Sequence, residues 1–357
     1  MLKLQKGSVA TKPVTEGCNL CAAGGKLVLF VTGLCNHHCY YCPLSEEKKG
    51  LDTIYADEMP VKNDSDIIYE ANMINALGTG ITGGDPLLRL DRTLKYINLL
   101  KNAFGDKHHI HLYTASGSKD AFKKLKDAGL DEIRKHVPET YWDRLKSSGY
   151  ASILKNAVDS ELYVGIEVPA IPHKESELAA LIKSADGLNV KFINLNELEF
   201  SETNWQSLKL HNFKTKSYVA TAVKNSQLTA LNVLDQIDAE MIVHYCSAAF
   251  KDGIQLKNRL KRRAKNVAKD YEIITKDNTL LRGEILTNTP YLLVEYLKKK
   301  HNIPQRLIEV ALEKIYIAPW ILEKISKEIE EPCFITEVYP TWDQLEVEKI
   351  NLKNEKL

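Results

Sequence analysis

The stretch Cys35-Asn-His-His-Cys39-Tyr-Tyr-Cys42 places three cysteines at the spacing Cys-x3-Cys-x2-Cys, shortly after the apolar run 26–32. That run, Lys-Leu-Val-Leu-Phe-Val-Thr, is rich in β-branched residues and predicts a short strand that ends at Gly33. Three thiolates can bind three irons of a [4Fe–4S] cluster and leave the fourth iron open to an outside ligand. The stretch therefore predicts an iron–sulfur centre at the carboxyl end of a strand.

The bulk properties are those of an ordinary globular protein, with 44% apolar and 27% charged residues in a chain of 357. This length suits one catalytic domain with extensions, or two domains. A net charge of +1 gives no global attraction to nucleic acid or membrane. No apolar run approaches the roughly 20 residues of a membrane span, and the first residues lack a signal-peptide core, so we expect a cytoplasmic protein without membrane contact. Seven cysteines in a reducing compartment favour metal ligands over disulfides.

A second motif, Gly83-Gly84-Asp85-Pro86, follows a short apolar segment that starts at Ile81. Two adjacent glycines let the backbone approach a ligand closely, and the aspartate and proline favour a turn. Such a turn is common by itself. Here, however, the turn follows the cysteine loop by roughly 45 residues, and two such motifs rarely occur together at this separation by chance.

Strand and helix patterns alternate from residue 26 to residue 201, which predicts six βα units. After the first two strands, the expected strands cover 107–114, 130–137, 162–172 and 191–201, and the expected helices cover 63–77, 90–104, 119–128, 141–158 and 176–185. Short connections between alternating elements imply right-handed crossovers and a parallel sheet. The fold class is therefore α/β.

The cysteine loop and the Gly-Gly-Asp-Pro turn together resemble the signature motifs of the radical S-adenosylmethionine (SAM) superfamily. The resemblance implies a partial (β/α)6 TIM-like barrel over residues 26–205. It also implies a [4Fe–4S] cluster on Cys35, Cys39 and Cys42, and SAM as the ligand of the open iron. In this family the reduced cluster cleaves SAM to methionine and a 5′-deoxyadenosyl radical that abstracts hydrogen from a substrate. A one-electron reductant such as ferredoxin or flavodoxin is then the expected redox partner.

The resemblance also suggests which further residues bind the cofactor. The backbone of Gly83, Gly84 and Asp85 would hold the SAM amino group, with Asp85 standing where the family usually has Glu. Tyr41 would lie against the adenine. The family's use of its later strands favours the following residues: Arg134 or Glu167 for polar SAM contacts, and Asn196 for contacts to the adenosine or substrate. Because strand side chains alternate between two faces, about half of the polar strand residues are expected to be structural.

Segment 1–25 precedes the expected barrel and carries Cys18 and Cys21, whose Cys-x2-Cys spacing can place two thiolates on one metal. An auxiliary zinc or iron–sulfur site would need ligands from elsewhere, with Cys246 first, and Cys333 or His244 completing it. The alternative is that Cys246 and Cys333 are small buried hydrophobic residues, as free cysteines commonly are.

Region 206–357 is expected to be an α+β accessory or substrate region. Residues 251–269 predict a helix with apolar residues on one face and seven Lys or Arg on the other. Such a basic stripe can neutralise phosphates, as in RNA binding, or it can be an ordinary solvated face. Beyond it we expect a hairpin over 271–286, helices over 289–330 with new starts at Pro304 and Pro319, and a strand over 333–339.

Three functions compete. The leading hypothesis is RNA modification, motivated by the basic helix. The second is modification of a protein or peptide, including glycyl-radical activation, because the whole chain resembles archaeal relatives of pyruvate formate-lyase activating enzyme. The more than 150 residues after the expected barrel weigh against an activase of minimal type. The third is a structural zinc site in a nucleic-acid-binding module, with His37 or His38 as the fourth ligand, which would leave the Gly-Gly-Asp-Pro turn unexplained.

Overall fold

The computed structural model describes residues 1–218 and 220–353. The chain divides into two compact units. The first comprises residues 1–72 and 76–258, and the second comprises residues 73–75 and those from 259 onward. The expected boundary at residue 205 differs from this division, because residues 206–258 belong to the first unit.

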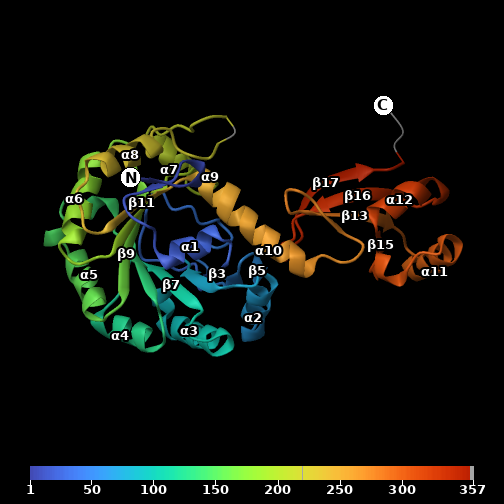
Figure 1. Cartoon of the computed structure of the whole chain (residues 1–357), viewed down its shortest axis with the longest axis horizontal. Coiled ribbons are helices and arrows are strands. Elements are labelled where there is room, and N and C mark those ends of the chain that lie inside the picture. Colours follow the sequence, from blue (N-terminus) through green and yellow to red (C-terminus); the bar gives the residue numbers. More distant parts are fainter. Residues whose placement is uncertain (219, 354–357) are drawn as a thin grey trace. The chain divides into compact units, whose positions relative to one another are not determined.

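The first unit is built on a curved sheet whose central strands are parallel and whose helices cover its outer face (Figure 1). The parallel strands are β3 (Lys26–Phe30), β6 (Gly78–Thr82), β7 (His109–Thr114), β8 (Glu132–Lys135), β9 (Tyr163–Ala170), β10 (Phe192–Glu197) and β11 (Ile242–Cys246). The covering helices are α2 (Asp64–Met73), α3 (Leu90–Phe104), α4 (Lys119–Asp127), α5 (Gly149–Asp159), α6 (Glu175–Asp186) and α8 (Ser226–Gln236). The prediction of an α/β partial barrel is confirmed.

β11 adds a seventh parallel strand to the six that we expected, and it pairs with β10. The short strands β4 (Tyr55–Ala56) and β5 (Met59–Pro60) extend the opposite edge beyond β3. A second difference concerns the helix expected over 141–158. It starts only at Gly149, after two 3-10 turns at Glu139–Tyr141 and Leu145–Ser147.

Segment 1–25 is part of the first unit. β2 (Val9–Ala10) pairs antiparallel with β11 and with β1 (Leu2–Lys3), which places the amino terminus at the sheet edge. α1 (Glu16–Ala22) begins at Thr15, whose side chain accepts a hydrogen bond from the Cys18 backbone N–H. This helix packs against β7.

The strand register decides which side chains share the barrel interior. Asn194 of β10 lies between Glu167 of β9 and His244 of β11. The side chains of directly opposite residues point to the same face of a sheet, so these three polar groups meet inside. The intervening residues Ile193 and Ile166 are fully buried against the covering helices.

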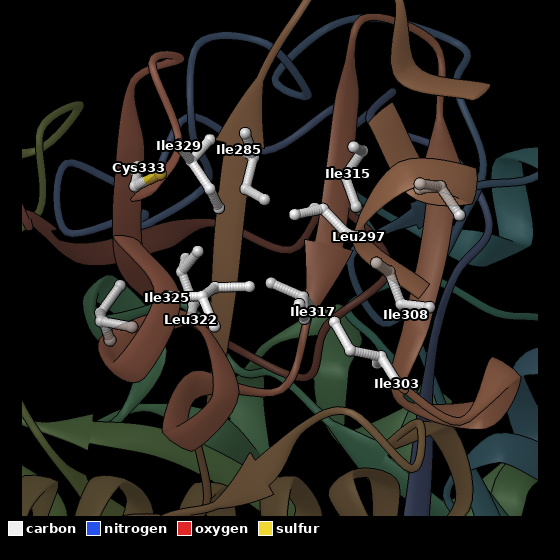
Figure 2. Packing of buried hydrophobic residues seen from close by; sticks show 12 residues of the cluster. Ile285, Leu297, Ile303, Ile308, Ile315, Ile317, Leu322, Ile325, Ile329 and Cys333 are labelled. Carbon is white, nitrogen blue, oxygen red and sulfur yellow. The ribbon is translucent and has the colours of Figure 1, made fainter. Parts of the chain in front are cut away.

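The second unit is a six-stranded antiparallel sheet in the order β14-β15-β13-β16-β17, with β12 also paired to β13. Its strands are β12 (Ile273–Ile274), β13 (Leu280–Leu286), β14 (Ile308–Ala311), β15 (Lys314–Ile317), β16 (Cys333–Val338) and β17 (Glu346–Asn351). Its two later helices are α11 (Pro290–His301) and α12 (Pro319–Ile325). Figure 2 shows the core, in which isoleucine and leucine side chains from strands and helices pack together.

Two predictions for this unit are confirmed and two are wrong. The hairpin over 271–286 exists as β12 and β13, and Pro319 starts α12. The stretch 308–317 is a β-hairpin rather than helix, and β17 follows the strand that we expected to be the last. The isoleucines of the hairpin occupy alternate positions and face the core. This period-2 pattern is typical of strands, but it is short and lies between two helical patterns in the sequence.

The basic helix expected over 251–269 consists of a π-helical turn, Lys251–Leu256, followed by α10 (Lys257–Val267). Leu260 and Ala264 are buried as expected. Arg263 is also buried, and its guanidinium donates a hydrogen bond to the Pro340 carbonyl at 2.6 Å. The basic residues of this helix therefore do not form one continuous solvated stripe, which corrects the prediction.

Candidate functional site

A cavity of about 920 Å³ opens inside the first unit, between the cysteine loop and the carboxyl ends of the parallel strands. Cys35, Cys39 and Cys42 all line it, as do Gly83 and Gly84. The two sequence motifs therefore meet at one cavity. Active sites of α/β barrels lie at this end of the strands.

The start of the cysteine loop needs a glycine. The Gly33 N–H donates to the Leu51 carbonyl at 2.8 Å, and a Cβ at Gly33 would lie 1.6 Å from the Lys48 carbonyl oxygen. The end of the loop is held by two residues that sequence reasoning passed over as a connection. Asn204 donates to the Tyr41 carbonyl at 3.2 Å, and Thr203 donates to the Cys42 carbonyl at 3.3 Å.

The glycine pair lets the end of β6 lie directly against the cysteine loop. A Cβ at Gly83 would come within 2.4 Å of the Thr32 carbonyl oxygen, and one at Gly84 within 2.3 Å of the Leu34 carbonyl oxygen. The Gly84 N–H donates to that Thr32 oxygen at 2.7 Å. Any side chain at either position would separate the two motifs, which explains why both residues are glycine.

Asp85 is 1% exposed, and its carboxylate is directed away from the cavity. It accepts hydrogen bonds from the Thr114 hydroxyl at 2.6 Å and from the Ser116 N–H at 3.0 Å. It also accepts one from the Leu87 N–H at 3.1 Å. These contacts tie the turn after β6 to the end of β7. The predicted contact of the Asp85 backbone with the cofactor stays a prediction, and the side chain positions the turn.

The cysteine thiols fit a multi-iron cluster better than a single ion. Among the described residues, no three His, Cys, Asp or Glu side chains lie close enough together to hold one metal ion. A [4Fe–4S] cluster does not need such convergence, because each thiolate binds a different iron. Burial, together with the charge of the other loop thiolates, raises the pKa of Cys35 and of Cys39 above the ordinary value. Repulsion of this kind between thiolates is offset by a cationic metal centre.

His136 connects the cysteine loop to β9. Its Nδ1 lies 3.3 Å from the Glu167 carbonyl oxygen, so Nδ1 carries the proton and Nε2 is an acceptor. The Tyr41 hydroxyl donates to Nε2 at 3.1 Å, and Cys39 Sγ lies 3.5 Å from the same nitrogen. Burial lowers the pKa of His136 to about 4. Tyr41 thus lines the cavity next to the cluster loop, as expected for a residue near the cofactor.

Arg134 and Glu167 also line the cavity, and they form an ion pair with Nη1 2.9 Å from Oε2. Arg134 Nε additionally contacts Glu132 at 2.5 Å, and the Glu167 carboxylate accepts from Asn194 and Asn196 at 3.0 and 2.8 Å. Burial alone would raise the pKa of Glu167, but the Arg134 charge and the two amides lower it below the ordinary value. The pair is therefore ionised. Asn196 itself is not among the residues that line the cavity, so we have no support for its direct contact with a ligand.

Lys26, at the start of β3, is a cavity residue that the sequence did not indicate. It is 5% exposed, and Nζ donates to the His109 and Thr79 carbonyls at 2.6 and 3.2 Å. Burial lowers its pKa to about 8. A lysine before an apolar run resembles an ordinary exposed strand start, so only the tertiary structure identifies it.

The auxiliary metal site on Cys18, Cys21 and Cys246 stays a prediction. Cys18 Sγ accepts hydrogen bonds from Arg134 and Asn194 at 3.5 and 3.6 Å. Burial raises the pKa of Cys21 to about 11 and that of Cys246 to about 12, so both are neutral thiols. Cys333 is a core residue of the second unit. Among the described residues, Cys18, Cys21 and Cys246 do not converge on a single ion, which is equally true of the three loop cysteines.

Comparison with known proteins gives two family matches. Residues 29–136 match the model of the radical SAM superfamily, and residues 278–352 match a domain of unknown function. The chain belongs to the radical SAM superfamily. Members of this superfamily are enzymes that bind a [4Fe–4S] cluster and SAM. In this chain, Cys35, Cys39 and Cys42 are the residues that would hold the cluster.

A relative covers nearly the whole chain. A Methanocaldococcus jannaschii protein, provisionally named as an activating enzyme of glycyl-radical enzymes, is 43% identical over 357 residues. The match spans 96% of this chain and 94% of the relative. The similarity therefore includes the second unit as well as the barrel.

Solved structures give more distant likenesses. Streptococcus suis SuiB bound to S-adenosylmethionine matches with a TM-score of 0.42 and 11% identity over 62% of this chain, and this chain spans only half of SuiB. Methylornithine synthase matches with a TM-score of 0.40 and 11% identity over 63% of this chain and 70% of that one. With TM-scores this low, these likenesses carry no functional argument. No helix within the described residues is long and apolar enough to cross a membrane.

Proposed function

We propose that this protein activates a partner protein by abstracting a hydrogen atom from it, with a glycyl-radical enzyme as the partner. The observation that carries this proposal is the full-length relative with that provisional name, together with the cysteine loop at the mouth of an internal cavity. When bound, the cluster and SAM supply the 5′-deoxyadenosyl radical that abstracts hydrogen. The residues of the chain position the reactants and exclude water.

The polar side chains of the cavity wall are suited to positioning the reactants. Arg134 and Glu167 form an ion pair, so these two side chains together add no net charge to the wall, which also contains Lys26. His136 is neutral, with its ring held between the Glu167 carbonyl and the Tyr41 hydroxyl.

RNA modification was the leading hypothesis, and neither the relative nor the basic helix supports it. The name of the relative refers to activation of a protein. Within the basic helix, Arg263 is buried, and Arg262 donates to the Ile74 carbonyl at 2.8 Å. The length of the chain after the barrel also argues less strongly against glycyl-radical activation. Residues 206–258 belong to the barrel unit, so the extension is shorter than expected.

The first test asks whether the chain cleaves SAM. The protein is reconstituted anaerobically with iron and sulfide, reduced with dithionite and supplied with SAM. We expect about four irons per chain and 5′-deoxyadenosine by mass spectrometry. Absence of 5′-deoxyadenosine from protein with a full cluster would contradict the assigned chemistry.

The second test asks what is modified. The reconstituted enzyme is incubated with each glycyl-radical enzyme candidate of the same genome, and electron paramagnetic resonance is recorded. A persistent organic radical that disappears when the target glycine is replaced by alanine supports activation. A changed tRNA or rRNA nucleoside profile in cells lacking the gene, without any such radical, would instead favour RNA modification.

A further inference from the structure

The second unit ends in a strand whose outer edge is open. β17 pairs with β16 on one side, and among the described residues no strand pairs with its other side. The Leu352 N–H donates to the Cys333 carbonyl of β16 at 2.9 Å. Because backbone groups alternate in direction along a strand, the N–H and C=O groups of Lys349 and Asn351 point to the open side. An edge of this kind is a template for another extended chain.

Large apolar side chains lie exposed on and beside this edge. Val347 and Ile350 of β17 are 47% and 50% exposed. Trp342 and Leu345, in the loop that leads into the strand, are 51% and 60% exposed. Single exposed apolar residues are ordinary, but four within nine residues at an open edge are typical of a binding surface.

The charges of the edge indicate which chains it excludes and which it accepts. Glu348 lies directly opposite Glu337 of β16, and no cation in the described part of the chain pairs with Glu348. Like charges in opposite positions destabilise a sheet. An added strand would place one of its residues on the free side of Glu348, where a Lys or Arg would offset this repulsion.

Lys349 does not supply that cation. Its ammonium contacts Glu284 at 3.0 Å and lies 4.7 Å from the centre of the Phe334 ring. It is therefore held on the face of the sheet opposite to that of Glu348, because consecutive strand residues point to opposite faces. The negative charge of Glu348 is therefore available to a cationic side chain of an external partner.

A second copy of this chain is a poor occupant. Two identical strands that pair antiparallel about a two-fold axis through the sheet have one residue opposite itself. The two registers that pair most of β17 are centred on Glu348 and on Lys349. Each places a charged side chain opposite its own copy, which opposes self-association.

We infer that the β17 edge binds an extended segment of a partner protein as an additional strand. The segment carries a Lys or Arg opposite Glu348 and an apolar residue two positions away, opposite Ile350. Main-chain hydrogen bonds would provide affinity, and these two side chains would provide selectivity. The partner class, a protein, rests on the proposed function, whereas the edge is a property of the second unit alone. The inference gives a role to the domain of unknown function at residues 278–352.

The test uses the full-length chain and labelled nine-residue peptides. The probe Gly-Ser-Thr-Val-Thr-Lys-Thr-Ser-Gly has valine two positions before lysine, so that antiparallel pairing places lysine opposite Glu348 and valine opposite Ile350. The matched peptide has Glu in place of Lys. Fluorescence anisotropy measures affinity, and amide hydrogen exchange locates the bound peptide. We expect binding of the lysine peptide only, with slowed exchange at Lys349 and Asn351.

Glu348→Lys should weaken binding of the lysine peptide at least about tenfold, and it should allow the glutamate peptide to bind. Glu323→Lys, at an exposed position of α12, is the matched control and should change neither affinity. Equal affinities for the two peptides, or protection elsewhere than β17, would overturn the inference. So would a stable dimer in sedimentation whose dissociation exposes the β17 amides.

The binding measurement needs neither SAM nor reductant, which separates the two proposals. If the peptide binds at β17 but reduced enzyme forms no radical on a partner, the proposed function fails and the edge remains a binding site. If partner activation is observed and Glu348→Lys leaves it unchanged, the proposed function stands and the role of the edge fails. SAM cleavage without a partner should be the same in Glu348→Lys and in the unchanged protein.

Discussion

The first unit has charged side chains around its cavity, whereas the main hydrophobic cluster of the second unit is apolar and its buried charges, Arg282 with Glu272 and Glu284, form a separate group. The barrel interior of the first unit contains Lys26, Glu132, Arg134 and Glu167. The core of the second unit is dominated by isoleucine and leucine, without a charged side chain in the cluster of Figure 2. Buried charges contribute little net stability even when they are paired, whereas buried apolar groups stabilise a fold directly. We therefore expect the charged group of the first unit to serve the cavity, whereas the apolar cluster stabilises the second unit.

The largest expected effect is the loss of SAM cleavage in the first unit when a cysteine of the loop is replaced. Replacing Cys35, Cys39 or Cys42 by alanine should abolish 5′-deoxyadenosine formation, because each thiolate holds one iron of the cluster. Iron content and product formation are measured after identical anaerobic reconstitution. Cys333→Ala is the matched control, since that thiol lies in the core of the second unit. Full activity in any of the three loop variants would contradict the ligand assignment.

The next effect concerns the apolar core. Ile317 is fully buried, and Ile317→Ala should destabilise the second unit by about 4 kcal/mol, through lost burial and the cavity left behind. Urea titration followed by hydrogen exchange of the β13 and β15 amides reports this unit specifically. If the barrel strands lost protection to the same extent, the two units would unfold together rather than separately.

Glu167→Gln tests the charged interior. It removes the negative partner of Arg134 and should cost about 3 kcal/mol at pH 7, less than the apolar truncation, because Glu132 still faces the guanidinium. The folded-state pKa of Glu167 is lowered, so its contribution is present above the unfolded value and is lost as the pH falls through the folded value.

The stability difference between the unchanged protein and Glu167→Gln should therefore be constant near neutral pH. It should shrink as the pH falls below the ordinary glutamate pKa of 4.5. Urea unfolding of the cluster-free chain between pH 3 and pH 7 measures it. A difference that stays constant down to pH 3 would show that Glu167 is not stabilised as a carboxylate.

The smallest effect is that of Cys333→Ala on stability. Cys333 is fully buried, and its thiol donates to the Glu331 carbonyl at 3.3 Å. We expect a loss of about 1 kcal/mol, as for a small hydrophobic residue with one weak hydrogen bond. A much larger loss, or a change in metal content, would indicate a role for this cysteine beyond packing.

The parallel sheet could be predicted because its signals are local. The strand after Gly129 and the helix Leu90–Phe104 have the expected type and position, since their apolar periods are regular and their ends carry glycine. The hairpin over 308–317 was missed because its turn includes Leu312 at a φ of 31°, where glycine or asparagine is usual. β11 belongs to the barrel because it pairs with β10, a contact between segments far apart in the chain.

The sequence by itself determined the family and predicted the cluster ligands, because both depend on residue type and short spacing. Cys35, Cys39 and Cys42 lie within one loop, and Gly83 and Gly84 are needed wherever that loop meets β6. The tertiary structure decided the rest. It joined the Asp85 side chain to Thr114, paired Arg134 with Glu167 and buried Lys26. Each of these depends on contacts between segments far apart in the chain, which strand register and packing set.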